Sequence, residues 1–101
     1  MPGLTKIRVP QERLSAFCER HHIRRLLFFG SALREDFTSD SDIDVLVEFE
    51  PGHTPGLRFL SIETDLGELL GRNVDLHTPN GLSPYLRDSV LAEAEEQYVK
   101  A

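Results

Sequence analysis

Two aspartates separated by one residue stand at the head of an apolar run in the middle of the chain. Asp42 and Asp44 flank Ile43, and Val45-Leu46-Val47 follows. Because residues i and i+2 of an extended segment project to the same face, the two carboxylates are expected side by side, with Ile43 directed into the core. Like charges this close raise each other's proton affinity unless a cation lies between them, and Mg²⁺ prefers oxygen ligands. The pair predicts a magnesium site.

A Gly-Ser pair precedes this motif, and a third acid follows it. Gly30-Ser31 ends the apolar run Leu26-Leu27-Phe28-Phe29, and Asp75 lies in a later β-rich segment. Glycine lets a backbone N–H approach a phosphate oxygen closely, and the serine hydroxyl can donate to the same group. On a strand beside that of Asp44, Asp75 would complete a second metal position and accept the proton of an attacking hydroxyl. This combination predicts a two-metal in-line displacement that releases pyrophosphate.

The segments that must position these residues alternate between helical and extended patterns. Apolar residues recur at three- and four-residue spacing in some stretches, whereas others are β-rich runs closed by glycine or proline. Helices covering one face of a short sheet would bury the apolar stripes, so the expected fold class is α+β with a short mixed β-sheet. Strand order and direction stay open. We expect helices over Pro10–His21, Gly56–Gly71 and about Pro84–Tyr98, and strands over Ile23–Phe29, Asp44–Phe49 and Val74–His77.

Size and composition limit the possible classes of protein. The 101 residues suffice for one hydrophobic core, so we expect a single domain over residues 1–101. No stretch approaches the roughly 20 apolar residues that span a bilayer, and the N-terminus lacks a secretory pattern. The lone Cys18 cannot form an internal disulfide, which favours the reducing cytoplasm. No membrane association is expected.

The charge balance bears on binding partners. The formal net charge of −6 would repel a phosphate backbone, so we expect no direct nucleic-acid binding. A basic protein partner fits better. The four histidines lack zinc-ligand spacing and no cysteine cluster accompanies them, although His77 could approach the acidic site.

The combined motifs resemble the polymerase-beta-like nucleotidyltransferase superfamily, whose signature is Gly-Ser, a spacer of about ten residues, Asp-x-Asp and a later acid. The chain is most similar to its minimal nucleotidyltransferase (MNT) group, typified by MntA-type antitoxins of HEPN/MNT toxin-antitoxin pairs. The matching segments are Gly30-Ser31-Ala32-Leu33-Arg34, Ser41-Asp42-Ile43-Asp44-Val45-Leu46-Val47, Val74-Asp75-Leu76 and Leu82-Ser83-Pro84-Tyr85-Leu86-Arg87. The resemblance covers roughly Ile23 to Tyr98. Glu35 departs from the glycine that many relatives carry there, which leaves substrate preference open.

The resemblance implies a function and a set of roles. It implies a polymerase-beta-like nucleotidyltransferase fold and transfer of AMP from ATP, with Mg²⁺, to a tyrosine hydroxyl of a HEPN-type toxin. Asp42, Asp44 and Asp75 would be the catalytic metal ligands. Gly30, Ser31 and Arg34 would contact the nucleotide.

Other readings of the same residues stay open. Asp-x-Asp also occurs in solvated turns and caps, and Arg34 could pair with neighbouring acids instead of a triphosphate. The chain could neutralise its partner by occlusion without catalysis. It could also modify a small hydroxylated compound.

Overall fold

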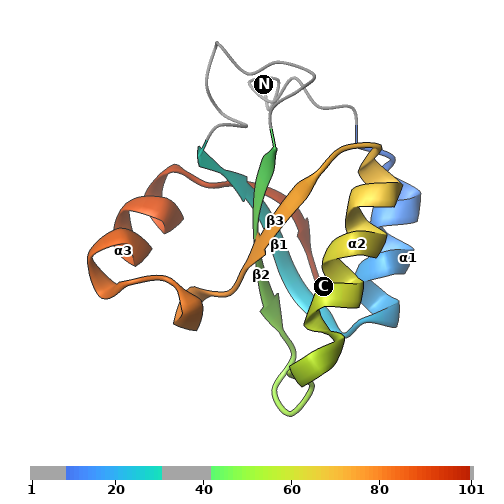
Figure 1. Cartoon of the computed structure of the whole chain (residues 1–101), viewed down its shortest axis with the longest axis horizontal. Coiled ribbons are helices and arrows are strands. Elements are labelled where there is room, and N and C mark those ends of the chain that lie inside the picture. The colour runs from blue at the N-terminus through green and yellow to red at the C-terminus, as the bar shows by residue number, and fades with distance from the viewer. Residues whose placement is uncertain (1–8, 31–41, 101) are drawn as a thin grey trace.

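In a computed structural model (Figure 1), the described part of the chain forms three α-helices and four strands. The structure describes residues 9–30 and 42–100. The predicted α+β class with a mixed sheet is confirmed, and five of the six predicted elements lie within a few residues of their expected bounds. The elements are α1 Gln11–Arg20, β1 Ile23–Phe29, β2 Ile43–Phe49, α2 Phe59–Leu70, β3 Val74–His77, α3 Pro84–Glu93 and β4 Glu95–Val99.

The sheet has the strand order β3-β2-β1-β4. β1 pairs antiparallel with both β2 and β4, whereas β2 pairs parallel with β3. The parallel pair requires a crossover, which α2 supplies after a 3₁₀ turn at Gly56–Arg58. Gly71 ends α2 with a φ of 70°, a left-handed conformation that glycine adopts without steric cost.

The hydrophobic core lies between the sheet and the pair α1 and α2, which cover one face as predicted (Figure 1). The buried stripes come from helical spacing in α1 and α2 and from alternate positions of the strands. Ile43 is buried in this core, as its place between two aspartates predicts. Cys18 also lies there, and burial raises the pKa of its thiol to about 12, which leaves it inert at neutral pH.

The C-terminal segment is the one element whose prediction is wrong. The expected helix over Pro84–Tyr98 ends at Glu93, and Glu95–Val99 forms the edge strand β4 beside β1. The apolar spacing of the segment suits a helix, but pairing with β1 satisfies backbone groups that would otherwise be exposed at that edge. Tyr98 then packs against the core. The pairing of this segment with β1 joins residues far apart in the sequence, so no local sequence pattern indicates it.

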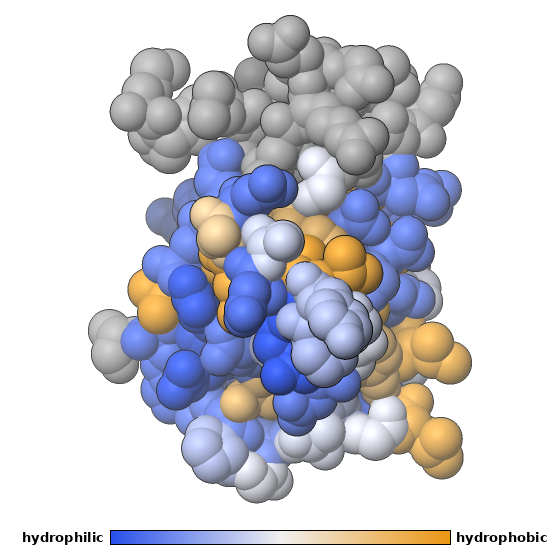
Figure 2. Space-filling view, turned by 90° about the vertical axis from the view of Figure 1, so that its left-hand side faces the viewer, coloured by the Kyte–Doolittle hydropathy of each residue, from blue (hydrophilic) through white to orange (hydrophobic). Residues whose placement is uncertain are grey.

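α3 differs from the other two helices because none of its residues is buried. In Figure 1 it lies on the side of the sheet away from α1 and α2. Ser83 caps it by accepting a hydrogen bond from the Leu86 N–H, and the Arg87 side chain donates to the Pro79 carbonyl at 2.8 Å. Tyr85 is 92% exposed, and Figure 2, which looks onto this side, shows apolar residues scattered among hydrophilic ones.

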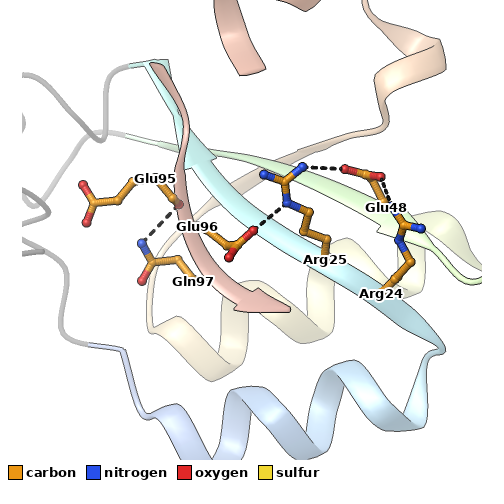
Figure 3. A network of polar contacts seen from close by, with 6 residues as sticks. All are labelled: Arg24, Arg25, Glu48, Glu95, Glu96 and Gln97. Carbon is orange, nitrogen blue, oxygen red and sulfur yellow. Dashed lines mark hydrogen bonds and ion pairs between the residues drawn. The ribbon is translucent and has the colours of Figure 1, made fainter. Parts of the chain in front are cut away.

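A chain of ion pairs crosses three strands on the sheet face opposite the core. The Arg25 side chain of β1 reaches Glu96 of β4 at 2.6 Å and Glu48 of β2 at 3.3 Å (Figure 3). Arg24 adds a 3.2 Å contact to Glu48. Partly exposed pairs of this kind each contribute roughly 0–1 kcal/mol, so the network refines strand register while the core supplies most of the stability.

No helix within residues 9–30 and 42–100 combines the length and apolar character needed to cross a membrane.

Two leucines of α2 offer a matched test of the core. Leu66 is fully buried, whereas Leu60 on the same helix is 69% exposed. We expect Leu66→Ala to lower the free energy of unfolding by about 2–5 kcal/mol because it leaves a cavity. Leu60→Ala should change it by less than about 0.5 kcal/mol. Urea denaturation followed by circular dichroism measures both, and equal losses would contradict the described packing.

Candidate active site

The predicted acidic residues lie together at one end of the sheet. At this end β1 stops, and β2 and β3 begin. Asp42 directly precedes β2, Asp44 is its second residue, and Asp75 is the second residue of β3. Alternation along the strands places Asp44 and Asp75 on the face away from α1 and α2, since the residues directly before them, Ile43 and Val74, face the core. The carboxylates therefore project from the face that the helical core leaves uncovered.

The strand register aligns the site across three strands. Asp44 is the Cα partner of Phe29 in β1 on one side and of Asp75 in β3 on the other. The Ile43 N–H donates to the Asn73 carbonyl at 2.9 Å, which sets this register at the first residue of β2. Asp75 therefore lies on the strand next to Asp44, which is the condition that the sequence argument set for its part in the site and left open.

Gly30 lies directly against the Asp44 carboxylate. Its φ is 64°, and a Cβ built on it would lie 2.5 Å from Asp44 Oδ2. Only glycine combines the left-handed backbone with the space that this carboxylate occupies. The glycine predicted to admit a phosphate thus also permits the position of a predicted metal ligand.

His77 borders the site two residues beyond Asp75 on the same face. Its Nε2 lies 3.9 Å from Asp44 Oδ1, and its ring meets the Phe29 ring edge-on at a centroid distance of 5.4 Å. The approach of His77, left as a possibility by the sequence, is confirmed. At 3.9 Å the two atoms are farther apart than in a hydrogen bond.

Glu63 of α2 supports β3 in a way that its sequence position does not reveal. Among the described strands β3 lies at an edge of the sheet, so its outward N–H groups have no partner in another of these strands. The Leu76 N–H donates to Glu63 Oε2 at 2.8 Å, directly after Asp75. A carboxylate acceptor makes a strong hydrogen bond. Glu63 therefore holds the backbone that carries Asp75.

The three aspartates suit a hard cation by their chemistry, since all their donor atoms are carboxylate oxygens. Within the described part of the chain, no three side chains of histidine, cysteine, aspartate or glutamate converge closely enough to hold an ion alone. Mg²⁺ commonly takes one or two carboxylates and completes its shell with water and substrate phosphates, so the residues fit such a shared site. Ser31 and Arg34, predicted to contact the nucleotide, lie outside the described residues.

Fold and residues together define a nucleotidyltransferase domain. The sequence matches the nucleotidyltransferase domain family over residues 11–96. This range runs from the start of α1 into β4 and leaves out only the last residues of β4. The chain therefore belongs to this family.

Individual relatives narrow the similarity to minimal nucleotidyltransferases. The protein adenylyltransferase MntA of Thermococcus cleftensis is 40% identical over 76 residues, which span 74% of this chain and 75% of that protein. A solved structure described as a predicted minimal nucleotidyltransferase is 42% identical, with a TM-score of 0.69 over 83% of this chain and 85% of that one.

A more distant structure shares the fold alone. It is a complex of an MNT antitoxin with a tri-AMPylated HEPN toxin from Shewanella oneidensis. The matched chain is 18% identical, with a TM-score of 0.61 over 89% of this chain and 70% of that chain.

Replacing Gly30 by alanine tests the contact with Asp44. Gly71 offers a control, because its φ is 70° but a Cβ there would meet nothing within 4 Å. Both Gly→Ala changes should destabilise the protein by roughly 1–3 kcal/mol through backbone strain. Only Gly30→Ala should also displace the carboxylate, and we expect nucleotide transfer to fall about 100-fold or more.

Thermal melts and initial rates on the folded variants measure the two effects. Equal transfer rates for Gly30→Ala and Gly71→Ala would show that the contact between Gly30 and Asp44 has no role in catalysis.

Proposed function

We propose that this chain transfers AMP from ATP to a tyrosine hydroxyl of a HEPN-type toxin. By this modification it acts as the antitoxin of that toxin. The observation that carries the proposal is the register of Asp44 beside Asp75, with Gly30 against the Asp44 carboxylate. The 40% identity to a named protein adenylyltransferase supports AMP as the transferred group. The HEPN complex of the more distant structural neighbour supports the kind of partner.

In the proposed reaction the tyrosine oxygen attacks the α-phosphorus of ATP. A new P–O bond forms to the tyrosine, the bond between the α-phosphorus and the bridging oxygen breaks, and pyrophosphate leaves with that electron pair. The phenolic proton passes to the carboxylate of Asp75, which is exposed on β3 and can release it to solvent. Holding the reactants in line is the main task of the site.

Asp42, Asp44 and Asp75 would hold Mg²⁺ together with the phosphate oxygens of the nucleotide. When bound, Mg²⁺ neutralises the charge that develops on the phosphate oxygens. The Gly30 backbone, left-handed at the end of β1, would let an N–H approach the triphosphate closely, and the Ser31 hydroxyl would donate to the same phosphates. Arg34 would add a planar guanidinium to the same phosphates.

The acceptor hydroxyl must reach the face that carries Asp44 and Asp75. α3 flanks this side of the sheet (Figure 1) and has no buried residue. A partner protein can therefore dock beside the carboxylates. The net charge of −6 favours a partner with a basic surface. The buried thiol of Cys18 suits a reducing compartment, and we place the reaction in the cytoplasm.

A catalytically silent antitoxin is the second candidate, because a small domain can also neutralise a toxin by covering it. The close packing of Gly30 and Asp44 favours the enzyme, since occlusion does not require a carboxylate at that position. The two candidates differ in whether the mass of the partner changes. Transfer to a small hydroxylated compound would leave the partner unmodified as well.

The direct test incubates the protein with ATP, Mg²⁺ and the co-encoded HEPN-type partner, and measures the intact mass of the partner. We expect a mass increase of one or more AMP units. The Asp42→Asn, Asp44→Asn double variant should transfer about a thousandfold more slowly, because several kcal/mol of transition-state charge stabilisation is lost.

Asp65→Asn serves as the matched control, since Asp65 is an exposed aspartate on α2 away from the site. It should transfer at the wild-type rate. An unmodified partner that is nevertheless bound and silenced would establish occlusion instead. Undiminished transfer by the double variant would remove Asp42 and Asp44 from the catalytic set.

A further inference from the structure

A second polar cavity lies at the end of the sheet opposite the aspartates. It has a volume of about 300 Å³ and lies where α1 leads into β1 and where the loop after β2 leads into α2. In Figure 1 this is the lower end of the molecule. β1 runs between the two sites from Ile23 to Phe29, a span of roughly 20 Å at about 3.3 Å per residue. The cavity is therefore separate from the proposed nucleotide site.

The cavity has a basic lining in an acidic protein. Among the residues that the structure describes, its wall contains no aspartate or glutamate, although the chain carries a net charge of −6. Within residues 9–30 and 42–100, Arg20 and Arg58 form no ion pair. Unneutralised guanidiniums beside hydroxyl and imidazole donors are suited to an anion. The lining residues are Arg20, His21, His22, His53, Thr54, Pro55, Arg58 and Ile62.

His21 supplies a second, independent observation. Both of its ring nitrogens are buried, and neither has a hydrogen-bond partner in the described part of the chain. Buried polar atoms normally have a partner. Neither nitrogen is open to the cavity, so a ligand can accept a hydrogen bond from His21 only if the ring turns toward it. Burial, followed by the charge of Arg20, lowers the pKa of His21, and Asp65 opposes this shift. At neutral pH the ring is therefore uncharged and can donate one N–H.

A transition metal fits these histidines less well. The His22 and His53 rings are stacked, with centroids 3.9 Å apart and planes inclined by 18°. Nitrogen lone pairs lie in the ring planes, so nearly parallel rings do not direct them at one ion. Glu50, the nearest carboxylate to His22, is 3.8 Å from it and is paired with Lys100 at 2.6 Å. The geometry therefore favours an anion over a cation.

We propose that this cavity binds the phosphate group of a small molecule, held by Arg20 and Arg58, with Thr54 as a hydrogen-bond donor and His21 as a second donor once its ring turns toward the cavity. The carbonyl end of α1 lies at Arg20 and disfavours an anion, so the binding energy must come from the two guanidiniums. The volume, at the lower end of small-molecule sites, accommodates a phosphate and a short substituent. This site is independent of the proposed AMP transfer.

The four histidines make the test direct, because His21, His22 and His53 line this cavity and His77 lies at the aspartates. The experiment records imidazole NMR signals of histidine-labelled protein during titration with inorganic phosphate, glycerol 2-phosphate and glycerol at constant ionic strength. We expect saturable shifts of the three cavity signals with both phosphates, none with glycerol, and none at His77. Phosphate should also move the titration of His21 to higher pH, since an anion stabilises the imidazolium.

Arg58→Gln should weaken phosphate binding about tenfold or more, because a charge-assisted contact is lost. Arg13→Gln is the control, since Arg13 is an exposed arginine of α1 outside this cavity. Saturable shifts with inorganic phosphate but none with glycerol 2-phosphate would contradict a small-molecule ligand and restrict binding to the free ion. Absence of saturation, a parallel shift of His77, or equal weakening by both arginine variants would overturn the proposal.

Discussion

The close contact between the Gly30 backbone and the Asp44 carboxylate is the constraint on which the site depends. β1 must end in a left-handed residue without a side chain, because a Cβ at Gly30 would lie 2.5 Å from Asp44 Oδ2. The same register sets Asp44 between Phe29 and Asp75. One close approach therefore fixes both the end of β1, where a phosphate would bind, and the position of a metal-binding carboxylate.

The two faces of the sheet have different tasks, which lets a small domain carry this charged site and remain stable. α1 and α2 bury one face and supply the core, so the other face can carry charges without losing that packing. Charge is also distributed along the exposed face, with the Arg25 network at one end and the aspartates at the other. The strand edge beside Asp75 needs support from α2, and Glu63 provides it through the Leu76 N–H.

Local patterns in the sequence predict the parts of the structure that local chemistry decides. The i, i+2 spacing of Asp42 and Asp44 predicts that both side chains lie on the same face of the sheet, and the burial of Ile43 between them agrees with this prediction. Long-range pairing is where sequence reasoning fails. β4 is formed because Glu95–Val99 meets the free edge of β1, and the helical spacing of its neighbours conceals this. The role of Glu63 and the clustering of three histidines likewise depend on tertiary contacts.

The most direct test of the account is whether a divalent ion binds at Asp44. Mn²⁺ can replace Mg²⁺ at oxygen ligands and broadens NMR signals of nearby nuclei. With ATP present and Mn²⁺ substoichiometric, the His77 imidazole signal should broaden first, because its Nε2 lies 3.9 Å from Asp44 Oδ1. The effect should disappear in Asp44→Asn. Equal broadening of His77 in that variant, or earlier broadening of His22 and His53, would contradict a metal-dependent site at the aspartates.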